Sequence, residues 1–222
     1  MKPQVTLGTI SDGRLYDLGD LVKADTDGCK NCSACCHGVG DFISLTPFDV
    51  HVLSKHMNMT FDELLVDALE CHETGKIEIP HLKMHGPSNK CYFLNEEDRC
   101  NIHAHRPSIC RLFPLGRVYE SGDFKYFLLK DACVKPELTD ILVEDWIGIK
   151  EYPENKAFIM AWHDILRALS FRVKFIYDDQ TLKGLNGYLR HTFYDMALDD
   201  GEDFYAAFFK RVPSAKNVLG IL

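Results

Sequence analysis

The chain has 222 residues, 46% of them hydrophobic, with a formal net charge of -8 and an isoelectric point of about 5.6. A chain of this length can bury a sizeable core without disulfides, and its acidic balance argues against a general binder of nucleic acid or of anionic membranes. No apolar run resembles a signal peptide or reaches the length of a transmembrane helix. We therefore expect a cytoplasmic protein that forms a single domain over residues 1–222.

Residues 1–28 form a polar lead-in with room for one strand, and residues 29–40 are a dense cysteine stretch. Two capping boxes then predict helices near 46–57 and 60–72. In each box a threonine is followed three residues later by an acidic residue, so that the two residues can satisfy each other's backbone N–H groups.

The middle of the chain predicts short strands and hairpins. Residues 77–84 alternate weakly and favour a strand. Two hairpins are expected, one over 91–102 and one over 117–130 around Ser121-Gly122. Between them, residues 107–114 begin with proline and end with proline, which predicts a short helical turn.

The last third differs in character, because no cysteine lies beyond Cys133. The predicted fold is α+β, with a cysteine-rich metal-binding lobe at about 29–133 whose short β-hairpins pack against helices, and a helical region at about 138–222. Helical apolar spacing occurs over 138–149, 155–171, 185–198 and 202–212.

Nine cysteines are many for a cytosolic chain, where disulfides rarely persist, so metal ligation is the better account. Four of them form C-x2-C-x2-C-C, a spacing that lets sulfurs converge while backbone N–H groups turn toward them. Four more follow at wider spacing, two of them at facing ends of the first hairpin. The predicted metal ligands are Cys29, Cys32, Cys35, Cys36, Cys91, Cys100, Cys110 and Cys133.

The ninth cysteine, Cys71, falls in an apolar helical pattern and is expected to be a buried structural thiol. Basic residues beside the cysteines would lower thiol pKa values and offset ligand charge; they are Lys30, Arg99, Arg106 and Arg111. Three nearby histidines could replace a thiolate, but hydrogen bonding or exposure is the expectation for each. They are His37, His103 and His105.

Other chemistry has weaker support. No P-loop, dinucleotide-binding glycine motif or radical S-adenosylmethionine cysteine spacing occurs. The acidic pairs Asp199-Asp200 and Glu202-Asp203 are expected at a solvated helix start. Aromatic residues at helical spacing in the last third are expected in the core; they are Phe193, Tyr194, Phe204, Tyr205, Phe208 and Phe209.

The ordered motifs resemble one family. The C-x2-C-x2-C-C run, followed by C-Y-F-L at 91–94, C-N-I-H at 100–103, Arg106-Pro107 and C-R-L-F-P at 110–114, is similar to the YkgJ-type CxxCxxCC cysteine-cluster proteins, described as zinc- or iron-chelating. The resemblance covers about residues 29–133. The same cysteine pattern occurs in bacterial flagellin lysine-N-methylases, which implies by analogy a link to an iron–sulfur centre and to S-adenosylmethionine chemistry.

The C-x2-C-x2-C start is closer to a ferredoxin loop than to paired zinc knuckles, so a [4Fe–4S] cluster is favoured and Zn2+ is the alternative. Three functions follow: a metal-binding protein with a structural or redox centre, a cluster-dependent methyltransferase-like enzyme that modifies proteins, or a metal carrier. The sequence does not decide whether the chain is an enzyme. Metal ions are the expected partners, with a protein partner or substrate possible, and nucleic acid and membrane are not expected.

Overall fold

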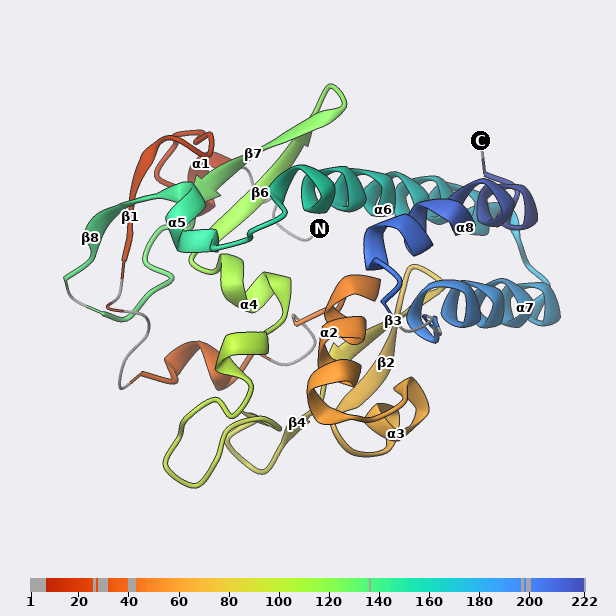
Figure 1. Cartoon of the computed structure of the whole chain (residues 1–222), viewed down its shortest axis with the longest axis horizontal. Coiled ribbons are helices and arrows are strands. Elements are labelled where there is room, and N and C mark those ends of the chain that lie inside the picture. Colours follow the sequence, from red (N-terminus) through yellow and green to blue (C-terminus); the bar gives the residue numbers. More distant parts are fainter. Residues whose placement is uncertain are drawn as a thin grey trace.

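The computed structural model describes residues 7–25, 27, 32–39, 43–135, 137–196, 198 and 201–221. The fold is α+β, as the sequence predicts: helices and small antiparallel strand pairs alternate along the chain (Figure 1). Within the described residues the strands form four two-stranded sheets, which pair β1 with β8, β2 with β3, β4 with β5, and β6 with β7.

The N-terminal lead-in contains α1 (Leu7–Ile10) and the strand β1 (Leu21–Asp25). β1 pairs with β8 (Thr139–Leu142), with Val22 opposite Ile141. The prediction of a helix over 138–149 is therefore wrong for its first residues, which form β8, and within that range only α5 (Val143–Ile147) is helical. Helical spacing in the sequence is overridden there because a distant strand supplies the backbone hydrogen bonds.

Both capping boxes form as predicted. They begin α2 (Pro47–Met57) and α3 (Phe61–Asp67), and in each the threonine side chain accepts a hydrogen bond from the backbone N–H of the acidic residue. α3 ends before residue 72, which was its predicted end, because Leu69–Thr74 form the strand β2 and pair with β3 (Ile77–Leu82). Cys71 consequently lies in a strand and is exposed, so the prediction of a buried helical thiol is wrong.

The hairpin predicted over 91–102 is only partly formed. Cys91 belongs to β5 (Lys90–Cys91), which pairs with β4 (Met84–His85), so the later pairing is reduced to one bridge between Leu94 and Cys100. The 3-10 turn η3 (His103–His105) and the predicted short helix α4 (Ser108–Leu112) follow.

The second hairpin is confirmed as β6 (Leu115–Glu120) and β7 (Asp123–Leu128). Ser121 and Gly122 have φ of 48° and 82°, as a two-residue turn of this kind requires.

The C-terminal third is helical. The long helix α6 (Tyr152–Arg172) is followed by η4 (Val173–Phe175), α7 (Asp179–Leu189), the π-helical turn η5 (Arg190–Tyr194) and α8 (Phe204–Leu219). α8 packs along α6 and continues through Pro213, past the predicted end (Figure 1). Asp203 caps α8 by accepting from the Ala206 N–H at 2.9 Å, whereas Asp199 and Asp200 lie outside the described residues.

One hydrophobic core cluster extends from Tyr16 to Ile221 and includes Cys91 of the cysteine lobe. Five of the six aromatic residues expected in the core are buried, and Phe209 is 39% exposed. The cysteine lobe and the C-terminal helices therefore share one apolar interior. In the described part of the chain no helix combines the length and the apolar character needed to cross a membrane.

Candidate metal centre

The described part of the first cysteine run docks on the strand that carries Cys91. The 3-10 turn η1 (Ala34–Cys36) is closed by the Cys36 N–H donating to the Ser33 carbonyl at 2.8 Å. Immediately after it, His37 forms a bridge with Lys90, and the Gly38 N–H donates to the Asn89 carbonyl at 3.0 Å. These backbone contacts bring the described end of the run, at Cys36, close to β5, although the two segments are far apart in sequence.

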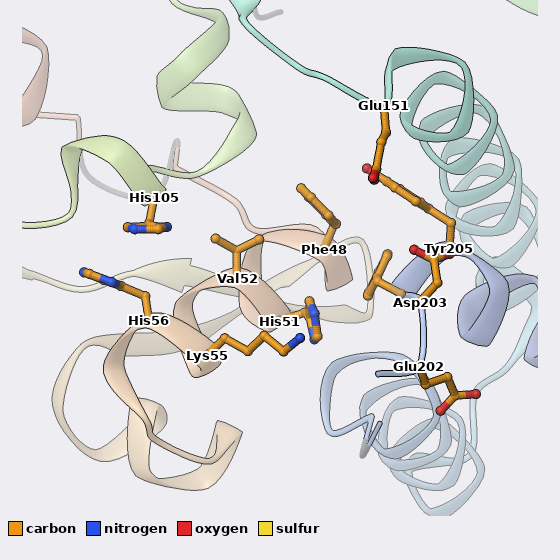
Figure 2. Close-up of a pocket in the computed structure, with 11 residues that line it drawn as sticks. Phe48, His51, Val52, Lys55, His56, His105, Glu151, Glu202, Asp203 and Tyr205 are labelled. Atoms are coloured by element: carbon orange, nitrogen blue, oxygen red, sulfur yellow. The ribbon is translucent and has the colours of Figure 1, made fainter. Parts of the chain in front are cut away.

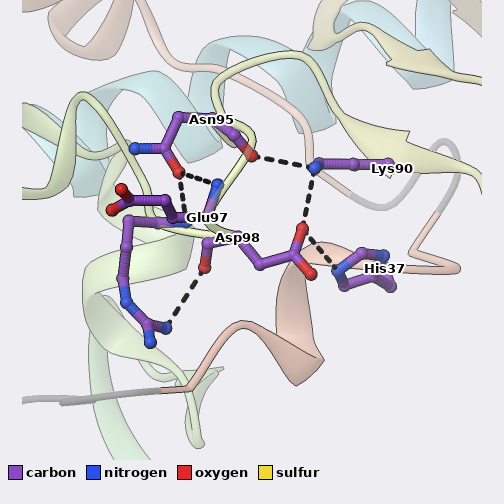
Figure 3. A network of polar contacts seen from close by, with 6 residues as sticks. His37, Lys90, Asn95, Glu97 and Asp98 are labelled. Atoms are coloured by element: carbon purple, nitrogen blue, oxygen red, sulfur yellow. Dashed lines mark hydrogen bonds and ion pairs between the residues drawn. The ribbon is translucent and has the colours of Figure 1, made fainter.

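A polar network holds the turn between Cys91 and Cys100 (Figure 3). The Lys90 ammonium donates to the Asn95 carbonyl at 2.9 Å and pairs with the Asp98 carboxylate at 2.7 Å. His37 Nε2 lies 3.9 Å from the same carboxylate. The hydrogen bond from Lys90 holds the pKa of Asp98 below its usual range, so this carboxylate stays charged. It links the turn before Cys100 to β5 through Lys90 and to the end of the first cysteine run through His37.

Asp49 of α2 positions the short helix that carries Cys110. Its side chain is 4% exposed. One oxygen accepts from the Thr46 N–H and hydroxyl, both at 2.8 Å, as part of the capping box. The other accepts from the Ser108 N–H at 2.7 Å and the Ser108 hydroxyl at 2.6 Å. A single carboxylate therefore joins the first turn of α2 to the first turn of α4.

Five thiols are close enough to perturb one another electrostatically. The Cys36 thiol donates a hydrogen bond to Cys35, which lowers the pKa of Cys35 to about 7 and raises that of Cys36. Burial raises the pKa of the other three, and the charges of neighbouring thiolates raise each of them further. We call these residues the five-thiol group: Cys35, Cys36, Cys91, Cys100 and Cys110.

The donor set of the five-thiol group fits a soft, multivalent metal centre. Partly buried thiolates repel one another, so ionising all of them together without a cation is unfavourable, and a multivalent metal ion or cluster removes that cost. Across the residues that the structure describes, no three His, Cys, Asp or Glu side chains are arranged in ligand geometry. The thiols are thus gathered in one region without being closed around one point.

The other predicted ligands are placed differently. Cys29 lies outside the described residues. Cys32 and Cys133 are half-buried. Cys133 lines a separate cavity of about 540 Å³ beside Lys130 and Lys135.

The predicted basic neighbours and histidines have mixed outcomes. The charge of Arg106 lowers the pKa of Cys35 and of Cys100, as expected. Arg111 instead donates to the Ala104 carbonyl at 2.9 Å. His103 contacts the Arg106 guanidinium, with 2.9 Å between Nη1 and Nε2. His105 stacks on His56, Arg99 contacts the Asp98 carbonyl, and Lys30 lies outside the described residues.

Sequence reasoning did not identify Asp49, Lys90 or Asp98 as parts of the site. The sequence indicates only the helix-capping role of Asp49, because its second role depends on Ser108, 59 residues away in sequence. Lys90 precedes Cys91, and Asp98 lies two residues before Cys100. Their position next to cysteines is the signal in the sequence that could have identified them.

Residues 28–134 match the model of the CxxCxxCC family, which is described as a "putative zinc- or iron-chelating domain". The resemblance found in the sequence is confirmed over this segment, and it supports a metal-binding function. The matched segment contains the five-thiol group and all the other predicted ligands, whereas the helices from α5 onward lie beyond it. No curated protein and no solved structure matches the chain.

Proposed function

We propose that the protein binds a [4Fe–4S] cluster through cysteine thiolates, with a structural or redox role, and that zinc is the alternative metal. The observation that carries the proposal is the five-thiol group, which three separated segments contribute to one region. A [4Fe–4S] cluster is held by four cysteine thiolates, and the five-thiol group contains that number.

The distribution of thiols favours one polynuclear centre over two zinc sites. Two closed structural zinc sites would need two separate groups of four ligands. The five-thiol group supplies enough thiols for one such set, and Cys133 lines a separate cavity. A single zinc ion would use four thiols of that group and is the alternative that remains.

The proposed ligands are the eight predicted cysteines, with the five-thiol group providing the primary set and Cys29, Cys32 and Cys133 the remainder. Cys71, exposed on β2, is excluded from the proposed set. The contiguous core supports a single domain, and a thiolate centre of this kind suits the reducing cytoplasm.

The ligand assignment is tested by comparing Cys110→Ser and Cys91→Ser with Cys71→Ser as the matched control. Each variant is purified without oxygen, and iron, zinc and acid-labile sulfide are measured per chain. We expect the first two to lose most of their metal and the control to retain it, because only the first two thiols belong to the five-thiol group. Full metal content in Cys110→Ser and Cys91→Ser would contradict the assignment.

A further inference from the structure

The C-terminal end of α6 exposes three aromatic rings. Phe171 and Phe175 are each 65% exposed, and Tyr177 is 85% exposed. The first two rings meet edge to face, with centroids 5.4 Å apart. They lie four residues apart, in the last turn of α6 and in η4, so they form one apolar stripe at helical spacing. We call Phe171, Lys174, Phe175 and Tyr177 the aromatic tip.

Lysine side chains border the rings of the aromatic tip. The Lys174 ammonium lies 5.9 Å from the centroid of the Phe171 ring, and the Lys76 ammonium lies 5.2 Å from the centroid of the Tyr177 ring. Lys76 also donates to the Ile176 carbonyl at 2.8 Å, which ties the β2–β3 turn to this segment. Ammonium groups over ring faces place positive charge directly beside apolar surface.

The two helices that meet at this end of the molecule are basic there. α8 packs along α6, and Arg172 near the end of α6 donates to the Leu219 carbonyl at the end of α8 (Figure 1). Residues 165–177 and 204–222 contain no Asp or Glu, although the whole chain has 33 acidic and 25 basic residues. They contain six basic residues, which are Arg167, Arg172, Lys174, Lys210, Arg211 and Lys216.

The acidic residues that flank the aromatic tip in sequence leave Lys174 unpaired. Asp164 pairs with Arg167 at 3.0 Å. Asp178 caps α7, where it accepts from the Thr181 N–H at 2.7 Å and the Thr181 hydroxyl at 2.6 Å. Among the described residues Lys174 contacts the Phe171 ring and has no carboxylate partner. A partner's carboxylate could therefore pair with Lys174 without displacing an ion pair.

The opposite end of α6 lacks this one-sided charge. A cavity of about 470 Å³ lies there, and Lys55, Glu151 and Asp203 all line it (Figure 2). Side chains of both signs offset each other at that end, so charge does not single out one kind of ligand.

We propose that the aromatic tip docks a segment of a partner protein that combines aliphatic side chains with carboxylates. The aliphatic side chains cover Phe171 and Phe175, and a carboxylate pairs with Lys174. Apolar burial supplies the attraction, and the charge pair selects an acidic segment over a basic one. This inference does not depend on which metal the cysteines bind.

Charge argues against the other occupants of such a surface. A symmetric contact between two copies would bring the basic tip of one copy against the basic tip of the other, so like charges oppose it. An anionic bilayer or a long nucleic acid would also face the remainder of the chain, which is more acidic than the chain as a whole. A short acidic segment meets the basic end alone.

The exposed area sets the strength of the expected complex. At about 200 Å² per ring, the exposed parts of the three aromatic side chains amount to about 400 Å². A standard stable interface buries about 800 Å² per partner. We therefore expect a transient complex that weakens as salt rises, because the charges involved are exposed.

The test uses the full chain, purified without oxygen and with its metal in place. The probe is a fluorescein-labelled synthetic peptide that has leucine at helical spacing and glutamate at the other positions, and fluorescence anisotropy measures its binding. We expect this peptide to bind. Replacing its leucines by serine, or its glutamates by lysine, should weaken binding by at least about tenfold, since each change removes one of the two attractions.

Two variants and two matched controls complete the experiment. Phe171→Ser and Lys174→Glu should each weaken binding of the glutamate–leucine peptide by about tenfold. Both side chains are exposed, so both variants are expected to fold, which circular dichroism checks. The controls are Val66→Ser, at a side chain that is 72% exposed on α3, and Lys150→Glu, at an exposed position just before α6; both should bind normally.

The proposal is overturned if the glutamate–leucine peptide does not bind, if the serine or the lysine peptide binds as well, or if the two tip variants match their controls. Tighter binding of phosphatidylserine vesicles or of a single-stranded oligonucleotide would assign the aromatic tip to a membrane or to nucleic acid and would equally overturn it. A dimer in sedimentation that Phe171→Ser abolishes would assign it to a second copy of the chain instead.

Discussion

Replacing Asp49 by alanine should loosen the metal centre without touching a cysteine. The variant removes the carboxylate that accepts four hydrogen bonds, two from Thr46 within α2 and two from Ser108 at the start of α4. Cys110 lies two residues after Ser108, so the same change releases the helix that presents this thiol.

The expected loss of unfolding free energy is the sum of the contributions of the two carboxylate oxygens of Asp49. The oxygen that caps α2 contributes about 1 kcal/mol, as helix caps do. The oxygen that accepts from Ser108 makes two charge-assisted hydrogen bonds, each worth about 1.5 kcal/mol at the low end of their range. We expect the variant to lose about 4 kcal/mol of unfolding free energy, which lowers the urea midpoint by about 2 M.

The chain supplies a matched control in the second capping box. Glu63 accepts from the Thr60 N–H at 2.7 Å and the Thr60 hydroxyl at 2.9 Å. It is exposed, and within the described residues its carboxylate bonds only to its own capping box, with no contact equivalent to that of Asp49 with Ser108. Glu63→Ala should therefore shift the urea midpoint far less and leave metal content unchanged. Urea unfolding followed by circular dichroism, with metal analysis of the same samples, measures both quantities.

The outcome that refutes this reasoning is equal behaviour of the two variants. If Asp49→Ala unfolds at the same urea concentration as Glu63→Ala and keeps its metal, then the contact between α2 and α4 stabilises neither the fold nor the centre. Loss of stability with full metal retention would show that Asp49 supports the fold alone.

Three further predictions address electrostatics and packing. During acid titration, Arg106→Met should release its metal at a higher pH than the control variant Arg167→Met. Loss of the Arg106 charge raises the pKa of Cys35 and Cys100, so protons compete with the metal for these thiolates at a higher pH. Equal release curves for the two variants would contradict this prediction. NMR titration of His51 should give a pKa below its usual 6.5, since burial disfavours the charged ring, and this residue's contribution to stability should decline as pH falls below about 6.5; a pKa at or above that value would contradict it. Gly116→Ala should destabilise the β6–β7 hairpin by about 1–3 kcal/mol in thermal unfolding, because a Cβ there would overlap the ring of Phe127, and an unchanged melting temperature would show that the ring moves at little cost.

Local sequence signals predicted the elements whose stabilising contacts are themselves local. The capping box at Thr46 and Asp49 set the start of α2, and the pair Ser121-Gly122 set the second hairpin, because these interactions span only a few residues. The α+β class followed from the same signals.

Elements stabilised by distant partners were missed. β8 has helical spacing but forms a strand, since β1 pairs with it from the other end of the lobe. Cys71 fits the pattern of α3, yet it lies opposite Pro80 in the β2–β3 pair. No window of sequence around either segment contains the partner that decides its structure.

The candidate site shows the same division. Cysteine spacing alone pointed to a thiolate centre, and the match of residues 28–134 to a metal-chelating family supports it. The grouping of five thiols, the role of Asp49 and the Lys90–Asp98 pair required the structure, because each depends on segments that meet only after folding.

The measurement that tests the central claim most directly is the stoichiometry of iron, zinc and acid-labile sulfide in the full chain isolated without oxygen. A [4Fe–4S] centre predicts about four iron and four sulfide per chain, together with a brown colour that disappears when the cluster is removed. Zinc without sulfide would contradict the cluster, and protein that holds neither iron nor zinc would contradict a metal centre at the five-thiol group.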